Sequence, residues 1–404
     1  MPTRHRPPRS HPRPAGFRSA RTRPFRSRRV VAVVGALAAA LAVGGTLPTP
    51  AAADRDSRDV LRQGLERLVR DDRYPAALAA TTRPDGRVRD YAVGVADLRT
   101  GARAPLDGRV RAGSNTKAFT ATVVLQLVGE GKVSLDAPVE TYLPRLVRGD
   151  GIDGRRITVR HILQHTSGLP DYVPYIDDLT GKGRHTYVQP RTTLDLGLAH
   201  KALFAPGRGW AYSNTNYTLA GLIIEKVTGR PLAEQITRRV IDRVGLRGTY
   251  FPGVGDERVR GAHPRGYFAE RPGAPLEDIT TMDPSWGWAA GQLISTPSDL
   301  NRFYAALFGG ELLAPAQLAQ MRTTVATPDG ELWPGARYGL GVISTPLSCG
   351  GLAWGHGGDI PGYQTSGGRT DDGRAVSIAV TADTPTVAQG PDDVRALVDA
   401  ALCR

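Results

Sequence analysis

Lysine is scarce in this sequence of 404 residues. Only five of the 52 basic side chains are Lys, at positions 117, 132, 182, 201 and 226, and the others are Arg. Several common signatures are also missing, since the chain contains no Walker motif, no dinucleotide-binding glycine fingerprint and no Gly-x-Ser-x-Gly elbow. These absences argue against a nucleotide site and against a serine presented on a strand-to-helix elbow.

The apolar stretch at residues 30–43 is shorter than the ~20 residues that a membrane-spanning helix needs. It follows residues 1–29, which contain ten Arg and no acidic residue, and it precedes Ala51-Ala52-Ala53. A basic segment, an apolar segment and a small-residue cleavage site are typical of a secretory signal peptide. We therefore predict that residues 1–53 are a signal peptide, with an uncleaved membrane anchor as the alternative.

The positive charge of the chain is concentrated in this leader. Without its ten Arg, the formal net charge falls from +13 to about +3. The rest of the chain mixes Arg with Asp and Glu and has no basic patch interleaved with aromatic residues, which argues against a nucleic-acid partner. We predict a monomeric protein that is secreted, either extracellular or associated with the cell wall. Ser27-Arg28-Arg29 is compatible with twin-arginine export, and Sec export is the alternative.

Cysteine is nearly absent, with Cys349 and Cys403 as the two examples. In an exported protein such a pair predicts one disulfide, which would tie the segment before His356 to the C-terminal helix. Two buried free thiols are the alternative.

A metal site is not predicted. His161 and His165 have the i, i+4 spacing of a zinc-binding helix, but Ile162 stands where a metalloprotease needs its glutamate base. No third ligand is evident, and the sequence implies no cofactor.

Ser114 and Lys117 form a Ser-x-x-Lys tetrad around one of the five lysines. Residues 114–117 resemble the first turn of a helix, in which positions i and i+3 share one face, so the amine can reach the hydroxyl. Serine is a weak nucleophile unless a neighbouring base takes its proton. Lys, unlike Arg, can lose its own proton near neutral pH when it is buried. The alternative is a helix cap followed by a solvated lysine.

Two later motifs favour the catalytic interpretation of this tetrad. Tyr212-Ser213-Asn214 follows a turn-rich segment, so it lies on a loop where side chains can converge on a pocket, although Asn214 could simply cap the next helix. His356-Gly357-Gly358 lies between a short apolar segment and a strand-like one, with a plain glycine turn as the alternative. The three motifs together indicate a catalytic site.

From about residue 55 onward the sequence resembles the serine penicillin-recognising hydrolases, in particular the branch of class C β-lactamases and D-Ala-D-Ala carboxypeptidases. Three longer phrases add to the resemblance: His165-Thr166-Ser167-Gly168-Leu169, Tyr212-Ser213-Asn214-Thr215-Asn216-Tyr217, and Gly291-Gln292-Leu293-Ile294-Ser295-Thr296 leading into Asp299-Leu300.

The resemblance implies that Ser114 is the acylated nucleophile and that Lys117 and Tyr212 move its proton and that of the leaving group. It also implies a second group of residues that contact the substrate: Asn214, His356, Gly357, Gly358 and Asp359. In this mechanism the backbone N–H groups of Ser114 and Asp359 would hold the oxyanion. Trp286, with Trp288 and Tyr363, is a candidate wall of the groove, and core packing is its alternative.

The third motif, His356-Gly357-Gly358, is more similar to the His-Thr-Gly motif of some carboxypeptidases than to the Lys-Thr-Gly motif of class C β-lactamases, but it lacks the hydroxyl of the middle Thr. A carboxypeptidase also needs a cation for the free carboxylate of its substrate, whereas the predicted strand 338–347 has none and Asp359 adds a negative charge. The expected function is that of a D-alanyl-D-alanine carboxypeptidase-like, penicillin-binding enzyme acting on peptidoglycan stem peptides, with β-lactams as further ligands. The alternatives are a class C-like β-lactamase, an esterase or D-amino-acid amidase of the same fold, and a non-catalytic cell-wall binding protein.

Hydrophobic spacing predicts helices and strands in a characteristic order. The chain opens with a helix at 57–71 and strands at 76–82 and 88–95, and it closes with strands at 338–343, 364–370 and 375–381 and a helix at 392–402. Between them the predicted elements are helices at 118–128, 159–164, 217–227, 232–244 and 297–307. We predict an α/β (α+β) fold, with an antiparallel sheet flanked by N- and C-terminal helices and an inserted all-helical lobe. The sheet lobe would comprise residues 54–112 and 285–404, and the mainly helical lobe residues 113–284.

Overall fold

The computed structural model describes residues 50–271, 273–383 and 390–404 of the chain. The predicted signal peptide, residues 1–53, lies outside the described residues except for 50–53, which form the first turn of helix α1 (Pro50–Arg70).

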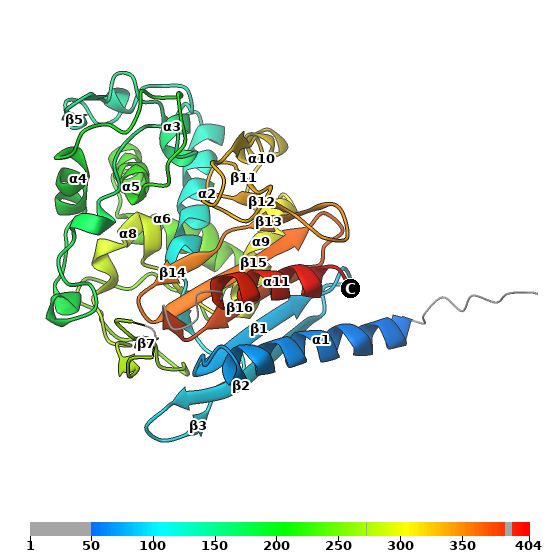
Figure 1. Ribbon diagram of the computed structural model, residues 1–404. Helices are drawn as coiled ribbons and strands as arrows, with labels where there is room; N and C mark the ends of the chain where they lie inside the picture. The colour runs from blue at the N-terminus through cyan, green and yellow to red at the C-terminus, as the bar shows by residue number, and fades with distance from the viewer. Residues whose placement is uncertain (1–49, 272, 384–389) are drawn as a thin grey trace, which may run out of the picture. The chain divides into compact units, whose positions relative to one another are not determined.

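A ten-stranded antiparallel sheet forms the centre of the described chain (Figure 1). Its strands are β1 (Ala76–Thr82), β2 (Val88–Asp97), β3 (Ala102–Arg103), β10 (Val325–Ala326), β11 (Arg337–Tyr338), β12 (Ile343–Pro346), β13 (Leu352–Gly355), β14 (Gly358–Ile360), β15 (Tyr363–Thr370) and β16 (Ala375–Val380). They lie in the order β10-β11-β12-β13-β15-β16-β1-β2-β3, and β14 pairs with β15 beside this path. Because β16 pairs with β1, the N-terminal hairpin and the C-terminal strands form one sheet.

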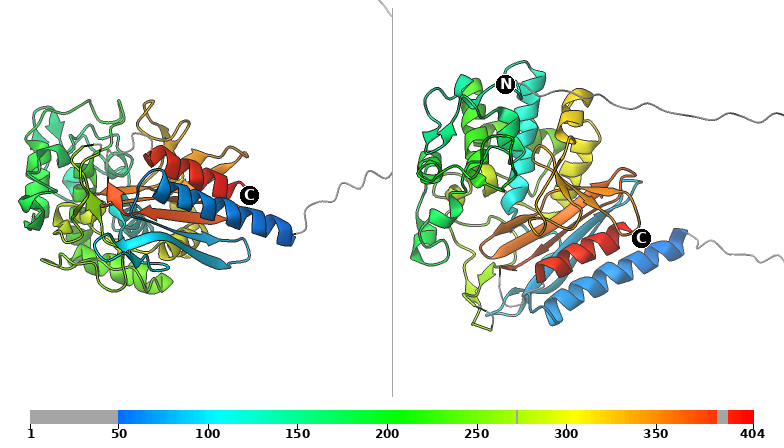
Figure 2. Two further views of the ribbon diagram at one scale, coloured as in Figure 1. Left: turned by 60° about the horizontal axis from the view of Figure 1, so that its bottom comes forward. Right: turned by 45° about the horizontal axis from the view of Figure 1, so that its top comes forward.

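Helices cover both faces of this sheet. Helices α1 and α11 (Gly390–Leu402) lie side by side on one face, and α9 (Pro297–Phe308) packs on the other (Figure 2). The apolar residues of α1 repeat at helical spacing, so they form one stripe toward the sheet. This stripe and its partners make a buried apolar layer that includes Leu61, Leu65, Leu68, Ala77, Ala79, Val376, Val394 and Leu397.

Helix α2 (Thr116–Gly129) runs through the middle of the helical part of the chain. Its residues are buried on nearly every side, against α5 (Asn214–Thr228) and α8 (Trp288–Gly291), as expected for a helix without a polar face. The other helices are α3 (Val159–Leu163), α4 (Pro190–Leu198), α6 (Leu232–Ile236), α7 (Asp242–Val244) and α10 (Pro315–Met321). Short strands pair outside the main sheet: β4 (Val110–Arg111) with β9 (Ile294–Ser295), β5 (Arg148–Gly149) with β6 (Ile152–Asp153), and β7 (Tyr267–Phe268) with β8 (Glu277–Asp278) and β17 (Ala382–Asp383).

The predicted fold class is confirmed, and β1 has the predicted bounds. The strand expected at 338–343 is wrong, since the chain turns between β11 and β12. Gly341 has a φ of +78°, and a Cβ there would lie 2.5 Å from the Cβ of Ala121 and 3.0 Å from the carbonyl oxygen of Lys117. The turn thus packs directly on α2, which requires glycine. The predicted bounds of the two lobes stay a prediction.

Candidate active site

Ser114 lies on a 3₁₀ turn, η1 (Gly113–Asn115), immediately before α2. The backbone of β14 packs against this turn so closely that a Cβ on Gly358 would lie 2.1 Å from the carbonyl oxygen of Ala112 and 2.9 Å from the backbone nitrogen of Ser114. Gly113 adopts a φ of +50° at the same contact. Glycine at both positions therefore allows the backbone of the turn that carries Ser114 to contact the backbone of the third motif, His356-Gly357-Gly358.

The side chain of Asn115 holds this turn from behind. Its Nδ2 donates to Thr365 Oγ1 on β15 at 2.8 Å, and its Oδ1 accepts from the Tyr304 hydroxyl on α9 at 2.7 Å. The turn is therefore fixed to both the sheet and the helix that covers it.

Lys117 is fully buried, with an exposed fraction of 0%. Its Nζ lies 3.0 Å from Ser114 Oγ, 2.7 Å from Asn214 Oδ1 and 2.9 Å from the carbonyl oxygen of Ala290. Burial lowers the pKa of Lys117 to about 7, although the carboxylates of Asp171 and Asp359 oppose this shift. A neutral amine still has two N–H groups for Asn214 and Ala290, which leaves its lone pair for the Ser114 hydroxyl.

Asp171 orients Asn214 for this contact. Its carboxylate accepts hydrogen bonds from the Asn214 backbone N–H at 3.0 Å and from Asn214 Nδ2 at 3.0 and 3.2 Å. Because the amide nitrogen is occupied by Asp171, the amide oxygen faces Lys117. The sequence motifs did not identify Asp171.

Tyr212 covers the other side of Lys117. Its ring stacks on that of His165 with centroids 4.4 Å apart, and Lys117 Nζ lies 4.8 Å from the Tyr212 ring centroid. Desolvation raises the pKa of Tyr212 well above its usual range, and its interaction with Ser114 only partly offsets this. The hydroxyl is therefore protonated near neutral pH, so it can pass a proton on but does not start as a phenolate.

A chain of hydrogen bonds connects the second motif to the third through Tyr338. The Ser213 backbone N–H donates to His165 Nδ1 at 3.2 Å, so the proton of that ring is on Nε2, which lies 3.1 Å from the Tyr338 hydroxyl. Tyr338 then donates to His356 Nε2 at 3.0 Å, and His356 Nδ1 donates to the carbonyl oxygen of Gly357 at 2.6 Å. This direction of donation assigns opposite tautomers to the two histidines.

Both histidines are neutral in this arrangement. Burial, assisted by the nearby Lys117, lowers the pKa of His356 to about 3, and it lowers the pKa of His165 well below its usual range. His356 therefore does not serve as an acid or a base near neutral pH, and its ring nitrogens are already occupied. It supports the third motif, whose Gly358 begins β14.

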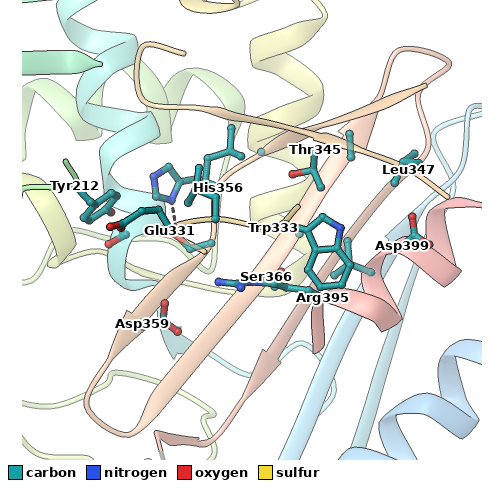
Figure 3. Close-up of a pocket in the computed structure, with 18 of the residues that line it drawn as sticks. Tyr212, Glu331, Trp333, Thr345, Leu347, His356, Asp359, Ser366, Arg395 and Asp399 are labelled. Carbon is teal, nitrogen blue, oxygen red and sulfur yellow. Dashed lines mark hydrogen bonds between the residues drawn. The ribbon is translucent and has the colours of Figure 1, made fainter. Parts of the chain in front are cut away.

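A cavity of about 410 Å³ opens at Ser114 (Figure 3). The predicted site residues that line it are Ser114, Tyr212, Asn214, His356, Gly357 and Asp359. Lys117 and Gly358 lie buried behind its wall.

Trp286 does not line this cavity. Its turn begins at Asp283, whose side chain caps it, and its ring is buried in an apolar cluster with Val110, Tyr172 and Tyr363. The core-packing alternative therefore describes Trp286.

The cavity is also lined by residues that the sequence motifs did not identify. They are Glu331 and Trp333, from the segment between β10 and β11, and Arg395 and Asp399, from α11 (Figure 3). The i, i+4 spacing of Arg395 and Asp399 places both on one face of the predicted helix, but only tertiary packing shows that this face borders the cleft.

The predicted disulfide is present. Cys349, in the turn between β12 and β13, is bonded to Cys403 at the end of α11, with Cα atoms 5.5 Å apart. It anchors the helix that carries Arg395 and Asp399 to the sheet.

The described parts of the chain contain no helix that is long and apolar enough to cross a membrane. Within residues 50–271, 273–383 and 390–404, no three His, Cys, Asp or Glu residues are grouped so that they could hold a metal ion. The helix α3 ends at Leu163, so His165 does not share a helical face with His161.

Comparisons with known proteins agree with this geometry. Penicillin-binding protein 4* of Bacillus subtilis (strain 168) is 29% identical over 62% of this chain and 56% of its own length, so the chain spans about half of that relative. A D-stereospecific amidohydrolase from Streptomyces sp. has a solved structure that is 38% identical, with a TM-score of 0.76 over 85% of this chain and 98% of its own.

Two further structures extend the comparison. The D-amino acid amidase from Ochrobactrum anthropi SV3 is 27% identical, with a TM-score of 0.75 over 86% of this chain and 97% of its own. An octameric penicillin-binding protein homologue from Pyrococcus abyssi is 25% identical, with a TM-score of 0.69 over 80% of this chain and 72% of its own. A family model described as Beta-lactamase matches residues 59–402. The chain therefore belongs to the β-lactamase family of serine hydrolases, which includes penicillin-binding proteins.

Proposed function

We propose that the protein hydrolyses the amide bond of D-amino-acid amides and short D-aminoacyl peptides that carry a free amino group. The observation that carries this proposal is the charge of the cavity, whose lining includes three acidic side chains, Glu331, Asp359 and Asp399, and one guanidinium, that of Arg395. An excess of carboxylates favours a substrate ammonium group and disfavours a substrate carboxylate.

The chemistry would be acyl transfer through Ser114. Neutral Lys117 takes the hydroxyl proton, directly or through Tyr212, while Ser114 Oγ bonds to the substrate carbonyl carbon. The backbone N–H groups of Ser114 and Asp359 stabilise the oxyanion, an interaction worth about 2.7–4 kcal/mol per donor. The C–N bond then breaks as the proton passes to the leaving amine. Water, activated by the same lysine and tyrosine, releases the acid and restores Ser114.

Glu331 is the best placed partner for the substrate amine. Figure 3 shows it between Tyr212 and Trp333, at the catalytic end of the cavity. Among the described residues no side chain forms a hydrogen bond or ion pair with its carboxylate, whereas the Asp399 carboxylate accepts from the backbone N–H and the hydroxyl of Ser348 at 2.8 and 2.5 Å. A free carboxylate on the wall of the cavity that contains the nucleophile is suited to an α-amino group.

The similar structures support this choice of substrate. The Streptomyces amidohydrolase is D-stereospecific by its name, and its match to this protein covers 98% of the amidohydrolase chain. The Ochrobactrum enzyme is a D-amino acid amidase, and its match to this protein covers 97% of the amidase chain.

Arg395 favours a second candidate, the D-Ala-D-Ala carboxypeptidase expected from the sequence resemblance. It supplies from α11 the cation that the predicted strand 338–347 lacks. However, it has Asp392 within 3.6 Å, and its charge also acts on Asp359, so a substrate carboxylate would compete with two acids for it.

A substrate panel on purified protein tests the proposal. We expect D-Phe-NH₂ to be cleaved at least tenfold faster than L-Phe-NH₂, N-acetyl-D-Phe-NH₂, N-acyl-D-Ala-D-Ala and nitrocefin. Glu331→Gln should reduce kcat/KM for D-Phe-NH₂ much more than for its N-acetyl derivative, and Ser114→Ala should abolish both activities.

Each other substrate corresponds to an alternative. Release of D-Ala with no amide cleavage would identify a carboxypeptidase, and rapid nitrocefin hydrolysis a β-lactamase. Cleavage of short-chain esters alone would identify an esterase. Ligand binding with no turnover of any of these substrates would indicate a non-catalytic cell-wall binding protein.

We also propose that the protein is exported and acts outside the cytoplasm. A disulfide in a chain with a basic and apolar leader supports this location. Detection of the Cys349–Cys403 crosslink in the culture medium or cell-wall fraction would test it. The predicted monomer is a separate proposal, to be checked by light scattering, since one homologue is octameric.

A further inference from the structure

The end of the cavity remote from Ser114 differs in chemistry from the catalytic end. Its apolar side chains come from three separate parts of the chain: Trp333 before β11, Ile343 and Leu347 at the start of β12 and just after it, and Val398 on α11. Arg395 and Asp399 of α11 border the same end with charged groups (Figure 3). In Figure 3, Trp333 and Leu347 lie on the side of the cavity away from Tyr212. A concave apolar surface next to a nucleophile binds the non-reacting part of a substrate.

Trp333 is held in position by a tight turn. The backbone N–H of Ala336 donates to the carbonyl oxygen of Trp333 at 2.8 Å, and Pro334 and Gly335 occupy the two central positions. Gly335 has a φ of +75°, which is the conformation required at the third position of a type II turn. The indole is thus presented by a preformed turn.

Helix α11 forms the opposite wall and is also fixed. Asp399 accepts from the backbone N–H and the hydroxyl of Ser348, and Cys403 is bonded to Cys349 in the same turn between β12 and β13. Val398 lies between these attachments and Arg395, so its distance from β12 is set by the disulfide end of the helix.

We infer that Trp333, Leu347 and Val398 form a subsite for the side chain of the D-amino acid and that this subsite selects bulky apolar, above all aromatic, side chains. The inference rests on the proposed function, since it assumes that the substrate amine lies near Glu331. Two rigid walls with apolar side chains match a flat ring, which packs well against an indole. The volume of about 410 Å³ is near the lower end of ligand sites, so the ligand is one or two residues long.

Kinetics with D-Ala-NH₂, D-Leu-NH₂ and D-Phe-NH₂ test the subsite. We expect the wild type to prefer D-Phe-NH₂ over D-Ala-NH₂ in kcat/KM, and Trp333→Ala to lower this ratio about 10–100-fold, the range that corresponds to losing the burial of one large apolar side chain. Trp333→Phe should restore part of the ratio. Leu352→Ala is a matched control, because Leu352 is an exposed apolar residue of β13 outside the cavity wall, and it should leave the ratio unchanged.

A second variant fills the subsite, whereas Trp333→Ala enlarges it. Val398→Phe should exclude D-Phe-NH₂ while D-Ala-NH₂ is still cleaved, so the inference can be tested even if Trp333→Ala does not fold. Equal losses on D-Ala-NH₂ and D-Phe-NH₂ in both variants would overturn the subsite and leave the proposed function intact. If the wild type cleaves none of the three amides but hydrolyses another substrate of the panel, the proposed function itself fails.

Discussion

The two ends of the cavity are stabilised in different ways. Around Ser114 the polar atoms are buried and bonded to one another, as in the contacts of Lys117 and in the chain from Ser213 through Tyr338 to His356. At the far end apolar side chains stand on α11 and on a turn, and one disulfide anchors the helix. Proton transfer needs fixed donors and acceptors, whereas side-chain selection needs only a shaped apolar surface. Substitutions at the first end should therefore affect all substrates, and those at the second should change selectivity.

The largest effect should follow Lys117→Arg. Arginine keeps the charge but cannot be deprotonated near neutral pH, so acylation of Ser114 should fall by about 10²–10⁴-fold for every substrate. Burst kinetics with an activated ester would measure this step, and thermal melting would show whether the fold is retained. A folded Lys117→Arg variant that acylates at the wild-type rate would exclude Lys117 as the base.

The pH dependence of acylation gives the next largest effect. Because burial lowers the pKa of Lys117 to about 7, the amine gains a proton below that pH and the rate should fall about tenfold per unit. Above pH 7 the rate should reach a plateau, and His356, whose pKa is about 3, should add no second transition near neutrality. A pH profile of kcat/KM for a neutral ester, whose own charge does not change, would test both statements. A midpoint near the usual lysine value would indicate that the base is not desolvated.

The sequence identified the parts of the site that are adjacent along the chain. Ser114 and Lys117 are three residues apart, and His356 and Gly358 are two apart, so local spacing is enough to suggest a shared role. Tyr338 and Arg395 could not be found in this way. Tyr338 joins His165, which lies 173 residues away, and Arg395 reaches the cavity because α11 packs on β15. Trp286 shows the opposite problem, since an aromatic residue near a motif is equally suited to the core and is in fact buried there.

Removal of the Tyr338 hydroxyl should have a smaller effect that is still common to all substrates. Tyr338→Phe leaves His165 Nε2 without an acceptor and His356 Nε2 without a donor, and each unpaired buried group costs about 1–3 kcal/mol of stability. Part of this cost falls on the third motif, which His356 supports, so kcat should also fall, by about 10–100-fold. Nitrogen NMR of the imidazoles would show whether Tyr338 acts as a positioning residue. In the wild type His165 should carry its proton on Nε2 and His356 on Nδ1. The variant should keep these tautomers, because Ser213 and Gly357 still occupy the Nδ1 atoms, but the Nε2 resonances of both rings should shift as they lose their hydrogen bonds to Tyr338.

A matched control separates this role from a general loss of stability. Tyr172→Phe also removes a buried hydrogen bond, from the tyrosine hydroxyl to the carbonyl oxygen of Trp286 at 2.6 Å, but it leaves the two histidines untouched. It should lower the melting temperature without shifting the Nε2 resonances of the two histidines. Unchanged Nε2 resonances of both histidines in Tyr338→Phe would refute the role assigned to Tyr338 between the two rings.

The smallest effect on turnover should come from the disulfide, at the other end of the cavity. Replacing both Cys349 and Cys403 by Ser removes the crosslink without leaving a free thiol, and it should destabilise the fold by up to about 4 kcal/mol, the value for closing a loop of 54 residues. Because the end of α11 next to the subsite would then be joined to the turn between β12 and β13 by Asp399 and Ser348 without the crosslink, the preference for D-Phe-NH₂ over D-Ala-NH₂ should fall while the rate on a small neutral ester changes little. Calorimetry and the substrate ratio measure the two effects separately. A double variant with lower stability but unchanged selectivity would show that the disulfide stabilises the fold without shaping the subsite. A uniform loss on all substrates would show that the two ends of the cavity are not independent.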